Sequence, residues 1–155
     1  YNYNVIHNTS YHDYPSYNGS YTRSLATVEN ILKDNSSDII IDVHRDAMAD
    51  LEYRPVTEIK GVQVAKLMFV MGVGSDTTKN PYMQDNLKLA LKLQMLADKV
   101  YPGLFKPMLV RNSVYNQDLN NYSLLVEVGA SGNTIEEAKL ATRCLTNLLN
   151  ILYND

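Results

Sequence analysis

The stretch Ile39-Ile40-Ile41-Asp42-Val43-His44-Arg45-Asp46 decides the fold class that we predict for this chain. Four of its first five residues are β-branched and apolar, which predicts a strand buried on both faces, as in a parallel sheet. In open α/β sheets the ligand crevice lies at the carboxyl ends of the strands. His44 therefore stands where a metal ligand or a catalytic base is expected, although a hydrogen-bonded structural histidine would give the same pattern.

A second buried strand of the same design is predicted at Leu124-Leu125-Val126-Glu127-Val128-Gly129. It carries one carboxylate, Glu127, near its end. Burying a carboxylate is costly unless the group is paired or binds a metal, so Glu127 is a candidate functional residue. Two strands that each deliver one titratable group to the same sheet edge predict an active site containing His44 and Glu127.

Length and composition restrict the class of protein. The chain has 155 residues, of which 45% are hydrophobic and 20% charged, as is typical of one ordinary globular domain. Its formal net charge of −3 and its lack of a Lys/Arg cluster argue against nucleic acid as a partner. The single cysteine, Cys144, excludes a disulfide framework and a cysteine-based zinc site, and we expect it to be a small core residue. No apolar run reaches the roughly 18 residues of a membrane span, and because the first residue is Tyr we expect a portion of a longer protein.

The N-terminal part is predicted to contain a strand, an aromatic loop and a helix. Tyr3 to Ile6 can form a short strand, and apolar residues at helical spacing predict an amphipathic helix over residues 22–33. The loop over residues 7–20 has Pro and Asn-Gly turn signals and carries Tyr14 and Tyr17. These tyrosines either pack the loop down by their own rings or form the wall of a ligand site, and composition leaves both open.

The remainder of the chain alternates strands with helices. We predict a β-hairpin of Val56–Ile59 with Val62–Val70, followed by a helix that begins at Asn80-Pro81 and ends at Tyr101-Pro102-Gly103. A strand is predicted at Met108–Arg111, and the capping box Thr134-Ile135-Glu136-Glu137 predicts the start of the last helix. Along one face of the helix that begins at Asn80-Pro81 we expect Leu87, Leu91 and Met95. The inner face of the last helix is expected to carry Leu140, Cys144, Leu148 and Leu152. This order predicts a single α/β domain over residues 1–155 with a largely parallel sheet.

The sequence argues against two familiar classes of enzyme, protein kinases and serine hydrolases. His44-Arg45-Asp46 matches the start of the protein-kinase catalytic loop, but the position that should hold a magnesium-binding Asn is Leu51. The Gly-x-Ser-x-Gly elbow of serine hydrolases is absent. Hydrolysis at a metal is what remains, with His44 as a ligand and Glu127 as the base.

Several motifs together resemble the stage II sporulation protein P family, over essentially the whole chain. They are Asp13-Tyr14-Pro15-Ser16-Tyr17-Asn18-Gly19-Ser20-Tyr21, Asp42-Val43-His44-Arg45-Asp46-Ala47, Asn80-Pro81 with Asn86-Leu87, and Leu125-Val126-Glu127-Val128-Gly129. The family comprises cell-wall hydrolases related to zinc N-acetylmuramoyl-L-alanine amidases. The resemblance implies a three-layer α/β/α fold with a mixed sheet. It also implies cleavage of the amide between glycan strand and stem peptide, and of cross-linked stem peptides.

The resemblance also implies roles for individual residues. His44 matches a zinc-binding His, and Glu127 matches the catalytic Glu that takes a proton from the attacking water and passes it to the leaving amine. Arg45 and Asp46 could orient substrate or His44, although ion pairs with neighbouring groups would explain them equally well. The loop that bears Tyr14, Tyr17 and Arg23 is expected to contact glycan or stem peptide.

One departure concerns the zinc site. In the family the other two ligands, a His and a Glu, come from a strand that precedes the residues present here, and His7 and His12 match the stretch after it. Because catalytic zinc normally needs three protein ligands, we expect these 155 residues alone to hold no stoichiometric zinc, unless His7 or His12 replaces a missing ligand, and to be inactive. Losing that strand would also leave an unpaired sheet edge.

The resemblance further implies peptidoglycan glycan strands, stem peptides and other engulfment proteins as partners, and an extracytoplasmic site at the sporulation septum, with the parent protein membrane-anchored. Two other functions stay open. A non-catalytic domain that binds peptidoglycan or a partner protein would explain the missing ligands. An unrelated α/β hydrolase using His44 with Asp46 would be active without a metal.

Overall fold

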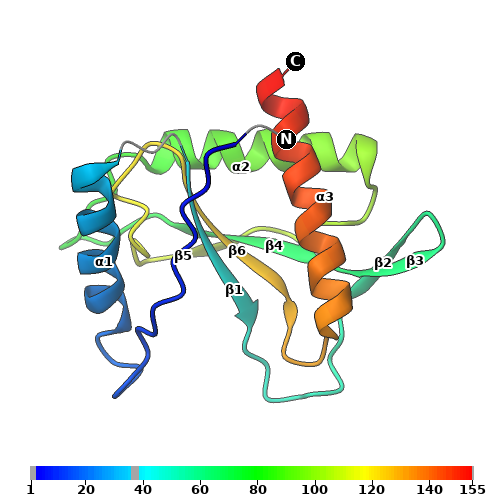
Figure 1. Ribbon diagram of the computed structural model, residues 1–155, viewed down its shortest axis with the longest axis horizontal. Helices are drawn as coiled ribbons and strands as arrows, with labels where there is room; N and C mark the ends of the chain where they lie inside the picture. The colour runs from blue at the N-terminus through cyan, green and yellow to red at the C-terminus, as the bar shows by residue number, and fades with distance from the viewer. Residues whose placement is uncertain (1–2, 36–38, 155) are drawn as a thin grey trace. The chain divides into compact units, whose positions relative to one another are not determined.

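The computed structural model describes residues 3–35 and 39–154, which fall into two compact units divided between residues 38 and 39 (Figure 1). The first unit contains helix α1, Ser20–Asp34, preceded by a loop. The predicted helix is confirmed, and it begins directly after Gly19, whose φ of 82° suits glycine. The second unit contains all the described strands and two further helices.

The predicted strand at residues 3–6 is wrong. This segment has no regular structure, and Val5 and Ile6 are 74% and 49% exposed. A strand needs a neighbour that accepts and donates backbone hydrogen bonds, and this segment is a strand of neither described sheet. The β-branched residues of this segment alone therefore do not produce a strand.

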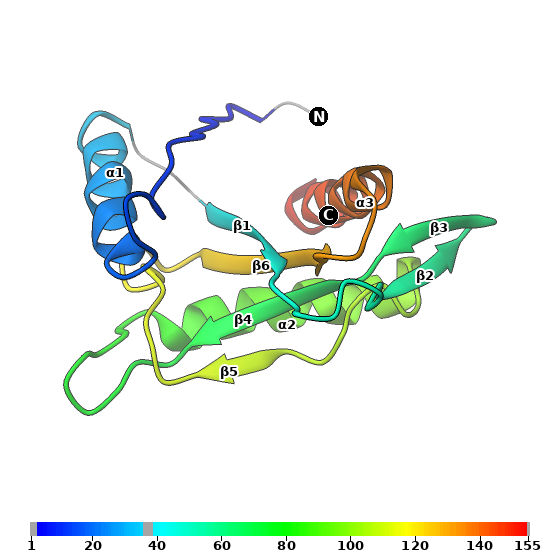
Figure 2. The ribbon, with the colours of Figure 1, turned by 90° about the horizontal axis from the view of Figure 1, so that it is seen from below.

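The second unit is built on a four-stranded sheet in the order β1-β6-β4-β5 (Figure 2). The strands are β1 (Ile40–Asp46), β4 (Leu67–Gly72), β5 (Leu109–Arg111) and β6 (Ser123–Ala130). The pairs β1/β6 and β4/β5 are parallel, and β4/β6 is antiparallel. The α/β class with a mixed, largely parallel sheet is thus confirmed.

The predicted hairpin is also confirmed, as a separate two-stranded sheet of β2 (Val56–Ile59) and β3 (Val62–Ala65). Its turn residues Lys60 and Gly61 both have positive φ, 52° and 80°, as a two-residue type I′ turn requires. The chain then continues through Lys66 into β4, so the predicted long second strand is divided into two.

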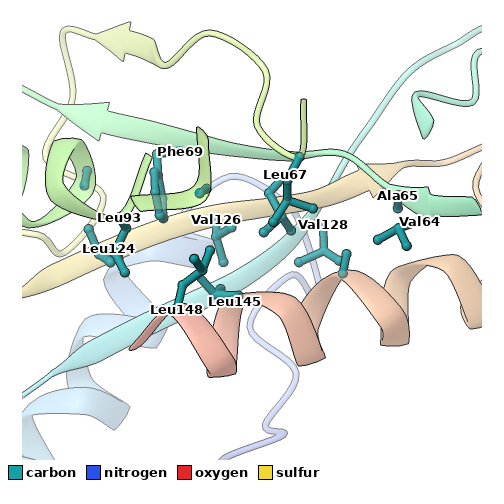
Figure 3. Close-up of a cluster of buried hydrophobic side chains, with 14 of the residues drawn as sticks. Val64, Ala65, Leu67, Phe69, Leu93, Leu124, Val126, Val128, Leu145 and Leu148 are labelled. Atoms are coloured by element: carbon teal, nitrogen blue, oxygen red, sulfur yellow. The ribbon is translucent and has the colours of Figure 1, made fainter. Parts of the chain in front are cut away.

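Helices α2 (Met83–Val100) and α3 (Ile135–Asn154) cover one face of the sheet and contact each other. Alternate residues of β4 and β6 point to that face and form the core with both helices, as Figure 3 shows for Phe69, Val126, Leu93, Leu145 and Leu148. The second unit by itself therefore has two layers. Since α1 belongs to the other unit, the third layer stays a prediction.

Strand β1 is not buried on both faces as predicted. It ends the order of the described strands, none of its residues is fully buried, and Val43 is 61% exposed. The strands that are buried on both faces are the central ones: all six residues of β4 are buried, and seven of the eight in β6. An apolar run alone does not distinguish a central from a terminal strand, which explains the error.

The helix faces differ in detail from the predictions. In α2 the buried apolar residues are Leu89, Ala90, Leu93 and Ala97, whereas Leu91 and Met95 are 45% and 63% exposed. The helix also begins at Met83, because Asn80 and Pro81 form a preceding turn in which Asn80 Oδ1 accepts from the Tyr82 N–H at 3.1 Å. In α3, Leu148 is buried as predicted, while Leu140, Cys144 and Leu152 are only partly buried against the core.

The capping box of α3 is confirmed. The Glu137 N–H donates to Thr134 Oγ1 at 3.2 Å, and Glu137 Oε2 accepts from the Thr134 N–H at 3.1 Å. The same carboxylate accepts from Asn133 Nδ2 at 2.9 Å and forms an ion pair with Arg54. Glu137 thereby fixes the start of α3 to the segment that leads into β2.

Candidate active site

The carboxyl ends of β1 and β6 bring His44 and Glu127 together, as predicted. The two residues are register partners in the parallel pairing of these strands. Because side chains alternate along a strand, Asp42, His44 and Glu127 point to the same face, opposite the face on which Ile41 and Val126 contact the core. We call this the site face; it is the side of the sheet away from α2 and α3.

Asp42 is the partner of His44. Its Oδ1 lies 3.0 Å from His44 Nε2, and the two side chains are 40% and 38% exposed. The hydrogen bond to Asp42 raises the pKa of His44 above 6.5, helped by the negative charges of Asp42 and Glu127 and opposed by burial. An ionised carboxylate can only accept, so the ring proton in this bond is on Nε2.

Glu127 is a half-buried carboxylate whose Oε2 is shielded from solvent and has no hydrogen-bond partner among the residues described. Burial raises its pKa above 4.5, and the nearby charges of Asp46 and Asp42 add to this, whereas His44 and Lys106 oppose it. A desolvated carboxylate with a raised pKa and an unused oxygen is well suited to accept a proton from water.

Lys106 and Tyr53 complete the site face, and sequence reasoning missed both. Lys106 Nζ lies 3.1 Å from Asp46 Oδ2 and 5.4 Å from the centre of the Tyr53 ring. Asp46 is thus part of an ion pair at the end of β1. Asp42 was also missed as the partner of His44, although its position two residues earlier on the same strand could have identified it. Nothing in the sequence around Lys106 links it to β1.

Arg45 points to the other side of β1. Its guanidinium donates to the backbone oxygen of Ala130 at 2.7 Å and to that of Asn133. These bonds hold the end of β1 to the turn between β6 and α3. They give Arg45 a structural role and leave its predicted contact with substrate as a proposal.

Tyr17 and Arg23 lie in the first unit. The Arg23 guanidinium donates to the backbone oxygens of His12 at 2.7 Å, Asn18 at 3.3 Å and Ser16. Tyr14 and Tyr17 are 78% and 74% exposed, so their rings do not pack the loop down. Arg23 holds the loop, and the loop presents its rings outward.

The zinc that the resemblance implies would need at least three protein donors close together. Within residues 3–35 and 39–154, no group of three or more His, Cys, Asp or Glu side chains is placed so that it could hold a metal ion. The carboxylates near His44 are engaged, Asp42 with His44 itself and Asp46 with Lys106. These residues therefore do not complete a zinc site.

Comparisons with known proteins agree with the motifs. The family model for stage II sporulation protein P matches residues 1–150. A stage II sporulation protein P from Bacillus subtilis (strain 168) is 33% identical over 146 residues, which cover 90% of this chain and 35% of the relative. The chain thus spans about a third of the length of that relative. No solved structure matches the chain.

In the part of the chain that the structure describes, no helix is long and apolar enough to cross a membrane. The family match extends over both units and includes Tyr17, Arg23, His44 and Glu127. On this evidence, the chain belongs to the stage II sporulation protein P family.

Proposed function

We propose that this protein is a zinc-dependent peptidoglycan hydrolase of sporulation. It would cleave the amide between N-acetylmuramic acid and L-alanine, and act as an endopeptidase on cross-linked stem peptides. The observation that carries the proposal is Glu127, a half-buried carboxylate with one solvent-shielded oxygen that has no partner among the described residues, placed beside His44 in the C-terminal halves of two parallel strands. Membership of a sporulation family supports it.

In this proposal Glu127 is the general base and then the general acid. Its carboxylate takes a proton from the water that attacks the amide carbonyl, and passes the proton to the leaving nitrogen. The raised pKa of Glu127 suits both steps, because the group binds a proton more readily than an exposed glutamate does.

His44 is the zinc ligand that this chain would contribute. Its Nε2–H donates to Asp42, so a neutral ring has its lone pair on Nδ1, and ligating imidazoles commonly make this kind of hydrogen bond to a carboxylate. Since the described residues do not complete the ligand set, the remaining ligands would have to come from outside them. Glu127 and the Asp42–His44 pair are the parts of the machinery that can be assigned to this chain.

Tyr17, with Tyr14, is proposed to contact glycan or stem peptide. Its ring is mostly exposed on a loop that Arg23 holds by three backbone oxygens. Arg23 would then act by shaping the loop, and Arg45 and Asp46 by fixing the end of β1 near the substrate.

The ligands would be peptidoglycan strands, and other engulfment proteins would be partners. The site of action would be extracytoplasmic, with the full-length protein anchored in the membrane.

A non-catalytic domain that binds peptidoglycan or a partner protein is the second candidate. The lack of a three-ligand metal group within the described residues favours it. The two functions differ in whether bonds are broken.

The test is a digestion of purified peptidoglycan by the full-length protein, before and after removal of metal with a chelator and again after zinc is restored. The hydrolase predicts metal-dependent release of stem peptides with a free L-alanine amino group, identified by mass spectrometry. Binding of peptidoglycan without any new amino group, with zinc present, would favour the non-catalytic domain.

A further inference from the structure

The Lys106 side chain lies on the site face and extends from beside β4 toward the end of β1. It lies in the segment between α2 and β5, where the Lys106 N–H donates to the Leu67 backbone oxygen at 2.7 Å, beside the start of β4. Its ammonium reaches Asp46 at the end of β1. Because the strand order places β6 and β4 between these two points, the Lys106 and Asp46 side chains together span both strands, and the ammonium is close enough to Glu127 to lower its pKa.

The contacts of Lys106 are sheltered from water. The Lys106 and Asp46 side chains are only 22% and 24% exposed, whereas an ordinary surface pair in this protein, Lys88 with Asp85, is 68% and 46% exposed at the same 3.1 Å separation. Charges that are partly removed from water interact more strongly and hold a more fixed geometry than exposed ones. The pair is therefore a better structural link than its distance alone suggests.

The link joins three separate segments around the site. Asp46 ends the strand that carries His44, Tyr53 lies in the connection to β2, and Lys106 is anchored on β4. The carboxylates of Asp42, Asp46 and Glu127 and the ring of His44 all act on this face, and Lys106 supplies a positive charge among them. The ammonium contacts Asp46 and the ring of Tyr53, so its interactions are made within the protein.

We propose that Lys106 is a positioning residue for the reaction at Glu127. By tying Asp46 and Tyr53 across the sheet, it fixes the end of β1 relative to β6 and so fixes His44 relative to Glu127. It acts through the protein and not by contact with substrate. This inference rests on the proposed hydrolase function.

The role predicts a specific kinetic signature. Misplacing reacting groups by a fraction of a bond length slows the chemical step, so Lys106→Met should lower kcat about tenfold or more and leave KM within about twofold. Lys106→Arg keeps the charge and the reach, and should restore most of kcat. Asp46→Asn removes the same link, so adding it to Lys106→Met should cost little more, as expected for two residues that act as one unit.

The experiment measures kcat and KM of the full-length protein on a soluble muropeptide, with Lys88→Met as the matched control. Lys88→Met removes an ion pair of equal length away from the site face and should leave both constants unchanged. Circular dichroism establishes that each variant is folded; should Lys106→Met fail to fold, Lys106→Arg and Asp46→Asn carry the test.

Four results would overturn the inference. A folded Lys106→Met enzyme with the kcat of the unmutated protein would show that the link has no part in catalysis. A raised KM with unchanged kcat would show that Lys106 binds substrate instead. If the unmutated protein cleaves nothing, or if Glu127→Gln cleaves normally, the proposed function fails and this inference fails with it. If Glu127→Gln is inactive and Lys106→Met is fully active, only the role of Lys106 is rejected.

Discussion

His44 on β1 and Glu127 on β6 are register partners in neighbouring parallel strands. Adjacent strands lie about 4.8 Å apart, so two partners on one face are held beside each other by backbone hydrogen bonds rather than by a flexible loop. Their relative position therefore depends on the integrity of the sheet near its carboxyl ends.

Asp42→Asn should lower the pKa of His44. The hydrogen bond to the Asp42 carboxylate is the largest cause of the raised pKa, and an amide removes the charge while keeping the shape. NMR titration of the His44 ring measures this directly. Asp50→Asn, at an exposed aspartate, is the control, and an unchanged titration of His44 in Asp42→Asn would refute the pairing.

Cleavage should be lost on the acid side at a pH above the ordinary glutamate value of 4.5. The base must be ionised, and burial raises the pKa of Glu127, so kcat/KM falls as the pH drops through that raised value. Because Lys106 lowers the pKa of Glu127, Lys106→Met should move the acid limb to higher pH. An acid limb at or below pH 4.5 in the unmutated protein would contradict the assignment of Glu127 as the titrating base.

Glu137→Gln should destabilise the fold by about 2 kcal/mol or more at neutral pH, because it removes a charged acceptor shared by Arg54, Asn133 and the Thr134 N–H. The pKa of Glu137 is lowered to about 2, mainly by the hydrogen bond from Arg54. The stabilisation is therefore present above 4.5 and is lost as the pH falls from 4.5 toward 2. Urea denaturation at pH 7 and pH 4 measures the difference, which should narrow at the lower pH. Glu136→Gln, at the exposed neighbouring residue, should change little at either pH.

Tyr17→Ala should weaken binding to polymeric peptidoglycan several-fold and leave the fold intact, because the ring is mostly exposed and makes surface contact only. Arg23→Met should weaken binding as well, but by loosening the loop whose backbone oxygens it binds. Sedimentation with the inactive Glu127→Gln background measures binding without cleavage. Tyr82→Ala, at a tyrosine 37% exposed on the other unit, is the control. Equal binding by all these variants would reject a substrate role for the loop.

Most of the elements of the second unit could be predicted from local patterns. The capping box at Thr134 and Glu137 and the Lys60-Gly61 turn act over a few residues, and both are present. The face of α2 could not be predicted from its leucines, because Leu87, Leu89, Leu91 and Leu93 spread around the helix. Ala90 and Ala97, which carry little hydrophobic signal, mark the buried side.

The site could be predicted in part. His44 and Glu127 each follow an apolar run, and the rule that parallel strands end at one edge brings them together. Lys106 could not be found this way, because its link to Asp46 depends on the strand order β1-β6-β4-β5, which local patterns do not determine. Arg23 is predicted to contact substrate as part of the loop that bears Tyr14 and Tyr17, yet it lies in α1 and donates hydrogen bonds to backbone oxygens of that loop.

The most direct test of the central claim compares Glu127→Gln with Glu52→Gln in the full-length protein, with zinc supplied and a soluble muropeptide as substrate. Glu52 is an exposed glutamate. We predict that Glu127→Gln lowers kcat by about 10²–10⁴-fold. We also expect it to keep the fold with equal or greater stability at neutral pH, because a buried carboxylate with a raised pKa opposes folding when it is ionised. Glu52→Gln should behave as the unmutated protein. A folded Glu127→Gln protein that cleaves the substrate at the unmutated rate would contradict the assignment of the active site.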